Sequence, residues 1–225
     1  TSYLHEIDRS HAVMATSAGR LGAEVGHYSL QHKEIIGLFD TFCMGMINGV
    51  FPQKALADIG MPLEGLSQSD LLAEMALVPR ELAEQCLAWY QAQGMRFEFG
   101  SDPATELTRD QVLEQCAMLI ALGRFVDRFG LSAVGVQYQQ GLARFCAASD
   151  FAEGAIGNAE RFPIPTVDGR IVRNGKAIPC INEVDMGTAI PQTMLWRLLD
   201  ALGLPAETTL HDIRWGSAFE GTLHW

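Results

Sequence analysis

The residues best suited to chemistry are two acids, Glu183 and Asp212, each at the end of a short apolar run in the last quarter of the chain. Each run is short enough to be a buried strand, so each carboxylate is expected where a strand ends. In an open α/β sheet, this is the edge at which ligands bind. Two carboxylates brought together there would bind a hard divalent cation, with magnesium or manganese favoured over zinc.

The position of these acids also fits a structural role. A single Asp or Glu after a strand is usually a helix N-cap or a solvated loop residue. Glu183 and Asp212 are separated by one predicted βαβ crossover, so their strands can be neighbours in a sheet. Asp185 and His211 lie beside them as alternatives. Metal binding and ordinary capping both stay open at this point.

Apolar periodicity and capping residues predict alternating strands and helices. Strands are expected at 35–44, 131–136, 178–183 and 209–212, and helices at 70–76, 80–93, 109–128, 150–160 and 188–202. Residues 161–170 are rich in Pro and turn residues and are predicted to be a loop. We expect an α/β fold with an open, mostly parallel, Rossmann-like sheet and helices on both faces.

Composition and charge restrict the classes of partner. The formal charge is −11, from 27 acidic and 16 basic residues, and no basic stripe is present, which disfavours nucleic acid. No uncharged run is long enough for a membrane-spanning helix, and no signal peptide is recognised at the start of the chain. The five cysteines are widely spaced and form no CxxC pair, so we expect reduced thiols in a cytoplasmic protein.

Five segments occur in an order that resembles the L-fucose isomerase-like family, with the L-arabinose isomerases as more distant relatives. They are Cys43–Asn48, Leu66–Asp70, Gly135–Gly141, Asn182–Asp185 and His211–Trp215. Each motif alone is unspecific, whereas their order and spacing together are fairly specific. The resemblance runs from about residue 35 to the end of the chain.

The resemblance implies a metal-dependent aldose–ketose isomerase that acts on a deoxy or substituted, fucose- or arabinose-like aldose through a cis-enediol. In the family, a Glu, an Asp and a His hold Mn²⁺, with Mg²⁺ or Co²⁺ as alternatives. Glu183 and Asp212 match the first two ligands and would also be catalytic, while the His lies beyond Trp225. The sugar would contact Met44 and Gln137. A homo-oligomer is implied as well.

The resemblance also implies two domains, an α/β middle domain at 1–170, best supported from residue 35, and the beginning of the catalytic domain at 171–225. The chain lacks an initiator Met and ends in residues typical of the start of a strand, so we expect a fragment of a longer protein. Two alternatives to the enzyme are a non-catalytic sugar-binding α/β domain and a sugar-sensing regulator.

Overall fold

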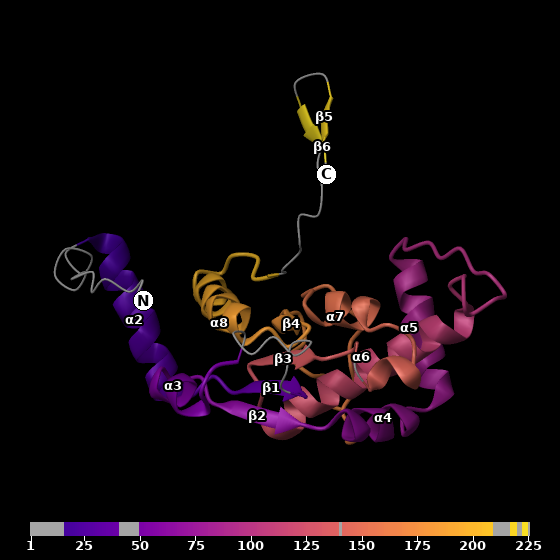
Figure 1. Ribbon diagram of the computed structural model, residues 1–225, viewed down its shortest axis with the longest axis horizontal. Helices are drawn as coiled ribbons and strands as arrows, with labels where there is room; N and C mark the ends of the chain where they lie inside the picture. Colours follow the sequence, from indigo (N-terminus) through magenta and orange to yellow (C-terminus); the bar gives the residue numbers. More distant parts are fainter. Residues whose placement is uncertain (1–15, 41–49, 140, 209–216, 220–221, 225) are drawn as a thin grey trace, which may run out of the picture.

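A parallel four-stranded sheet lies at the centre of the computed structural model, which describes residues 16–40, 50–139, 141–208, 217–219 and 222–224 (Figure 1). The strands are β1 (Ile36–Phe39), β2 (Leu63–Leu66), β3 (Ala133–Val136) and β4 (Cys180–Asn182). Their order is β2-β1-β3-β4, and every neighbouring pair is parallel. The predicted open, parallel α/β fold is therefore confirmed.

Helices connect the strands in the order that a parallel sheet requires. They are α2 (Ser17–His32), α3 (Gln53–Asp58), α4 (Gln68–Ala76), α5 (Arg80–Ala92), α6 (Arg109–Phe129), the 3-10 turn η2 (Leu142–Arg144), α7 (Asp150–Ile156) and α8 (Met186–Ala201). Strands β5 (Ser217–Phe219) and β6 (Thr222–His224) form a separate antiparallel pair.

The two faces of the sheet are covered by different helices because side chains alternate along each strand. On β1, Ile36 and Leu38 pack in a smaller apolar core with Leu56 of α3 and Ala189 of α8. Phe39 points the other way, into the larger core built from α4, α5, α6 and α7. Helices therefore lie on both faces, as the sequence predicts.

Local signals fix the limits of the longest helix. Thr108 and Gln111 form a reciprocal capping box at the start of α6, and Gly130 ends it in the left-handed conformation with φ +63°. Both devices satisfy backbone groups that a helix end leaves without partners. The predicted helix 109–128 is therefore correct to within one residue.

Several elements differ from expectation. The strand predicted at 35–44 ends at Phe39, and β4 has three residues, so both are shorter than the apolar runs suggest. The helix predicted at 150–160 ends at Ile156. Strand β2 and helix α3 were not predicted, since the Leu63–Leu66 run contains Glu and Gly and lacks a β-branched residue.

The chain on both sides of residue 170 contributes to the same sheet. Strand β4 pairs with β3, with Val136 opposite Asn182, and Pro165 forms an antiparallel bridge with Ile171. Helix α8 contacts both β4 and α2. The division of the longer protein at residue 170 stays a prediction.

Candidate functional site

The strand order places a topological switch point between β1 and β3. From β1, the chain continues to β2 on one side, whereas β3 and β4 lie on the other. At such a point the helices that follow the two strands lie on opposite faces, and a crevice forms outside the carboxyl ends. Figure 1 shows β1, β3 and β4 side by side. Asp40 follows β1, Gln137 follows β3 and Glu183 follows β4, so polar residues from three neighbouring strands lie at this edge.

Gln137 is fully buried at this edge and is tightly held. Its backbone N–H donates to the carbonyl of Phe39 at 3.1 Å, and its own carbonyl accepts from Nε2 of Gln68, at the start of α4. Its side-chain Oε1 accepts from the backbone N–H of Gln139 at 3.0 Å. Gln137 is therefore a structured residue at the switch point and not a solvated strand end.

Glu183 directly follows the neighbouring strand β4 and is linked to Gln137 through one residue. Val136 and Asn182 are paired in register, so Gln137 and Glu183 occupy equivalent positions beyond their strands. Nε2 of the exposed Gln139 donates to Oε1 of the half-buried Glu183. Gln139 thus bridges the two residues that sequence analysis selected at this edge.

The backbone at Glu183 has an unusual conformation. Glu183 and Val184 have φ angles of +52° and +55°, in the left-handed region that β-branched residues rarely adopt. Each such residue costs about 1–3 kcal/mol unless its surroundings hold it. Val184 is 1% exposed and packs in the smaller core, which supplies that restraint.

Asp185 is a helix N-cap, the structural role that the sequence analysis gave as an alternative for Glu183. Its Oδ1 accepts from the backbone N–H of Gly187 at 3.0 Å, and it is the N-cap of α8. Of the two acids after β4, Asp185 therefore caps the helix, which leaves Glu183 as the acid bonded to Gln139 at the carboxyl edge.

Sequence reasoning missed a second acid close to Glu183. The Glu153 carboxyl, on α7, accepts from the Ser149 hydroxyl and lies 4.0 Å from Sγ of Cys180 in β4. Burial raises the pKa of Glu153 to about 7; the bond from Ser149 opposes this rise, and the negative charges of Asp150 and Glu183 add to it. No sequence pattern distinguishes Glu153 from a surface acid, because its burial comes from the packing of α7 on β4.

Asp40 was also missed, because the predicted strand extended past it to Met44. It adopts φ +68° directly after β1, and its N–H donates to the carbonyl of Leu66 at 3.0 Å. Burial raises the pKa of its carboxyl. An acid with left-handed backbone at a switch point is a feature that sequence spacing alone does not reveal.

Met44 and Asp212 lie outside the described residues, but the chain leading to Asp212 is described as far as Thr208. Nε2 of Gln192 donates to the carbonyl of Cys180 at 3.0 Å and to that of Thr208 at 3.1 Å. Thr208 therefore lies next to the open edge of β4.

The described residues at this edge provide some of the oxygen ligands that a hard cation needs, but not a complete set. Glu183 offers carboxylate oxygens, which suit Mn²⁺ or Mg²⁺. Across residues 16–40, 50–139 and 141–208, no group of three His, Cys, Asp or Glu side chains is placed to hold a metal ion. Glu183 is thus the one predicted ligand that can be located, and a complete set needs residues such as Asp212.

No protein-family model matches this chain. A search of curated proteins finds no significant match either. The class of protein is therefore defined by its fold, an open parallel α/β protein with a polar carboxyl edge.

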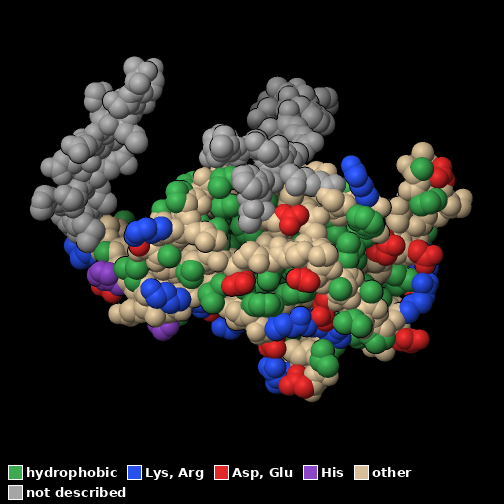
Figure 2. Space-filling model, turned by 60° about the horizontal axis from the view of Figure 1, so that its bottom comes forward, with side chains coloured by type: hydrophobic (Ala, Val, Ile, Leu, Met, Phe, Trp, Pro, Cys, Tyr) green, Lys and Arg blue, Asp and Glu red, His purple; other side chains and the backbone are tan. Residues whose placement is uncertain are grey.

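The helices and surface charges of the described part of the chain bear on membranes and nucleic acid. None of its helices is both long and apolar enough to cross a membrane. On the face drawn in Figure 2, basic side chains lie in separate places with acidic ones between them, rather than in one stripe of the kind that nucleic-acid binding needs.

Proposed function

We propose that this chain supplies metal- and sugar-binding residues of a divalent-metal-dependent aldose–ketose isomerase. One observation carries the proposal: Gln137 and Glu183 occupy equivalent positions beyond two paired parallel strands, and Gln139 bonds to both. The exposed Gln139 amide beside the Glu183 carboxylate suits a polyhydroxy substrate, since a primary amide both donates to and accepts from hydroxyl groups.

The position of Thr208 supports a role for Asp212 in the same site. Asp212 is four positions after Thr208, and an extended chain of that length spans about 13 Å. Cys180, beside Thr208, is three residues before Glu183. The chain after Thr208 is therefore long enough to bring Asp212 level with Glu183.

The chemistry requires a proton to move between C2 and C1 of an open-chain aldose by way of a cis-enediol. Glu183 and Asp212 would hold Mn²⁺, with Mg²⁺ or Co²⁺ as alternatives. When bound, the cation supplies charge stabilisation for the oxygens that become negative. Gln137 and Met44 would orient the sugar, and Glu183 would accept or return the proton. A positioned acid–base group contributes about 10²–10⁴-fold to rate. A deoxy or substituted aldose is the proposed substrate class.

The decisive experiment combines Mn²⁺ titration by calorimetry with an aldose-to-ketose assay on the complete protein. Glu183→Gln and Asp212→Asn each remove a negative oxygen ligand, and we expect each to weaken Mn²⁺ binding and to lower turnover by about 100-fold or more. Asp185→Asn is the matched control, because Asn also caps helices well. Its metal affinity and turnover should stay close to those of the wild type.

Two results would contradict the proposal. If Glu183→Gln and Asp212→Asn bind Mn²⁺ as tightly as the wild type, these acids are not the ligands. If the complete protein with Mn²⁺ converts no aldose to a ketose, the isomerase activity is wrong.

One contact favours a second candidate, a non-catalytic sugar-binding domain or sugar-sensing regulator. The Glu183 carboxylate already accepts a hydrogen bond from Gln139, so one of its oxygens has a partner without a cation. Such a protein would bind an aldose equally well with and without Mn²⁺, and it would leave the sugar unchanged.

A further inference from the structure

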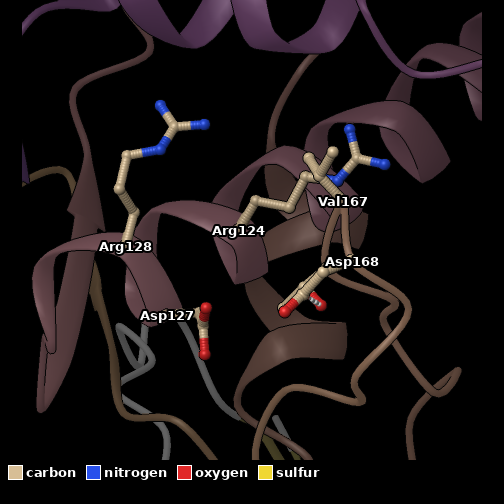
Figure 3. Close-up of a pocket in the computed structure, with 6 residues that line it drawn as sticks. Arg124, Asp127, Arg128, Val167 and Asp168 are labelled. Carbon is tan, nitrogen blue, oxygen red and sulfur yellow. Dashed lines mark hydrogen bonds between the residues drawn. The ribbon is translucent and has the colours of Figure 1, made fainter.

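A second polar pocket, independent of the proposed isomerase site, lies at the other end of the sheet. It has a volume of about 330 Å³ and is formed by the last two turns of α6 and by the Pro-rich loop before β4 (Figure 3). Its lining consists of Arg124, Asp127, Arg128, Thr166, Val167 and Asp168. Because α6 ends where β3 begins, the pocket is at the amino end of the strands, whereas Gln137 and Glu183 are at the carboxyl end.

One wall of the pocket carries surplus positive charge. Arg124 and Arg128 lie one turn apart on α6, and both bind the same carboxylate, Glu74 of α4, at 3.2 and 2.6 Å. The Glu74 side chain is 7% exposed, so two guanidinium groups share one buried acid. Within the described chain, Nη2 of Arg124 and Nε and Nη1 of Arg128 donate no hydrogen bond. These groups are therefore available to a carboxylate in the pocket.

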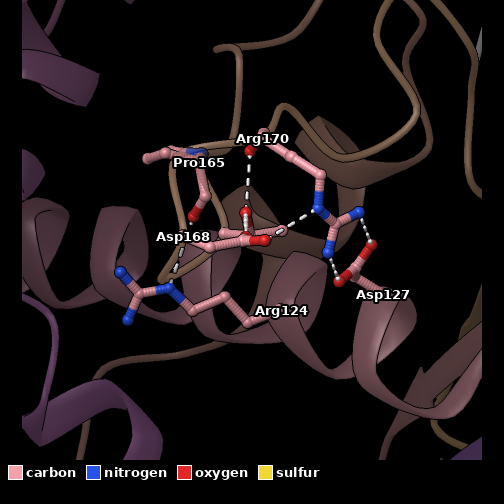
Figure 4. A network of polar contacts seen from close by, with 6 residues as sticks. Arg124, Asp127, Pro165, Asp168 and Arg170 are labelled. Atoms are coloured by element: carbon pink, nitrogen blue, oxygen red, sulfur yellow. Dashed lines mark hydrogen bonds and ion pairs between the residues drawn. The ribbon is translucent and has the colours of Figure 1, made fainter.

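The other side of the pocket, formed by Asp127 of α6 and Asp168 of the loop, carries surplus negative charge. Arg170 is held between two acids, with both of its terminal nitrogens on Asp127 at 3.1 and 3.0 Å and its Nε on Asp168 at 3.0 Å (Figure 4). Two carboxylates thus share one cation. The Thr166 hydroxyl also donates to Asp168, and this bond together with Arg170 lowers the pKa of the Asp168 carboxyl, which keeps it charged.

We propose that this pocket binds a free α-amino acid with an apolar side chain. Its carboxylate would pair with the guanidinium groups of Arg124 and Arg128, and its ammonium group would pair with Asp127 and Asp168. Figure 3 shows both guanidinium groups on one side of the pocket and both carboxylates on the other, as a zwitterion requires. An anion alone would face the acidic wall, and a cation alone would face the two arginines.

Size and the remaining lining residue agree with this ligand class. A volume of about 330 Å³ lies at the lower end of the range for small-molecule sites. Val167 is 83% exposed at the pocket and offers an apolar surface to the side chain of the ligand. Each carboxylate oxygen accepts more than one hydrogen bond, so Asp127 and Asp168 retain capacity for an ammonium group beside Arg170.

The test uses calorimetric titration of the complete protein with four probes. L-leucine carries both charges, 4-methylpentanoate lacks the ammonium group, 3-methylbutylamine lacks the carboxylate, and inorganic phosphate is a simple anion. We expect L-leucine to bind, and each of the other three to bind at least about tenfold more weakly. Absence of L-leucine binding, or equally tight binding of 4-methylpentanoate, the amine or phosphate, would overturn the proposal.

Substitutions of residues that line the pocket test whether L-leucine binds there. Arg128→Met keeps the aliphatic stem and removes the donors, while Asp168→Asn removes charge from the opposite wall. Each should weaken L-leucine binding by about tenfold. Arg96→Met, at an exposed arginine in another loop, is the control and should bind as the wild type does. Since Asp168 is 63% exposed on a loop, its variant remains informative if Arg128→Met fails to fold. Unchanged L-leucine affinity in Asp168→Asn would place the ligand elsewhere and refute the site.

Discussion

At the scale of single residues, Glu153 shows how packing changes the chemistry of an ordinary acid. A glutamate carboxyl in water has a pKa of about 4.5, and burial between α7 and β4 raises the pKa of Glu153 to about 7. Between these values the folded protein keeps a proton that the unfolded chain has released. The free energy of unfolding therefore falls as the pH rises from about 4.5 to about 7.

Glu153→Gln should remove this pH dependence. The neutral amide oxygen still accepts the hydrogen bond from Ser149, so we expect the variant to be at least as stable as the wild type at pH 8 and to show a flatter profile at lower pH. Urea unfolding at pH values from about 5 to 8 measures the effect. Glu160→Gln, at an exposed acid nearby, should keep the wild-type slope. An unchanged slope in Glu153→Gln would show that Glu153 is not the titrating group.

At the scale of elements, the sheet depends on a glycine in its central strand. A Cβ on Gly135 of β3 would lie 2.9 Å from the carbonyl oxygen of Ile181 in β4 and 2.9 Å from Cδ2 of Leu38 in β1. The carbonyl belongs to a paired strand and cannot move aside without disturbing the ladder. Only glycine lets three strands approach this closely at the switch point.

We therefore expect Gly135→Ala to lower the free energy of unfolding by about 1–3 kcal/mol, as overpacking does. Gly65→Ala is the matched control on β2, because a Cβ there would meet no atom within 4 Å. That variant should be neutral or slightly stabilising. Chemical denaturation of both variants would test the argument, and equal stabilities would contradict it.

Elements with local signals were predictable from sequence, and those defined by distant contacts were not. Thr108 and Gly130 mark the ends of α6 through bonds to adjacent residues, and the prediction agrees with the structure there. Strand β2 is stabilised by its pairing with β1, and no residue pattern within β2 predicts this pairing. In the candidate site, Glu183 was predicted because it follows an apolar run, and Gln137 was selected only through the family resemblance. Glu153 was missed because its burial depends on how α7 packs.

At the scale of the whole molecule, one buried ion pair joins the beginning and the end of the described sheet layer. Arg197 of α8 donates from Nε and Nη2 to the two oxygens of Glu34, each at 2.7 Å, and Glu34 is 2% exposed just before β1. Burial opposes ionisation of Glu34, but the bonds from Arg197 and Ser132 outweigh it, and the pKa of the carboxyl is lowered.

Arg197→Met should destabilise the protein by about 3–5 kcal/mol, because it leaves the Glu34 charge buried without its partner. A Glu34→Gln/Arg197→Met double variant removes both charges and should recover part of that loss. Denaturant unfolding of the wild type, both single variants and the double variant gives the coupling energy. Additive effects would mean that the pair does not hold α8 against the start of β1.

Because the pKa of Glu34 is lowered in the folded protein, the free energy of unfolding should decrease at acid pH. A group whose folded pKa is depressed stabilises the protein above its unfolded pKa and loses that contribution as the pH falls through the folded value. We expect wild-type stability to drop below about pH 4.5, the ordinary pKa of a glutamate carboxyl, and the drop to be smaller in the double variant. Unfolding curves between about pH 3 and 6 would reveal it.

The contact between Gln192 and β4 has a consequence for self-association. β4 is an outer strand of the four-stranded sheet, and an uncovered outer strand is a template on which another chain can add. The Gln192 amide donates to the carbonyls of both Cys180 and Thr208, and it thereby holds Thr208 beside the outer edge of β4. Residues of the same chain therefore cover this edge. A chain that ends before Thr208, or a Gln192→Leu variant, would expose the outer edge of β4 and become prone to aggregation.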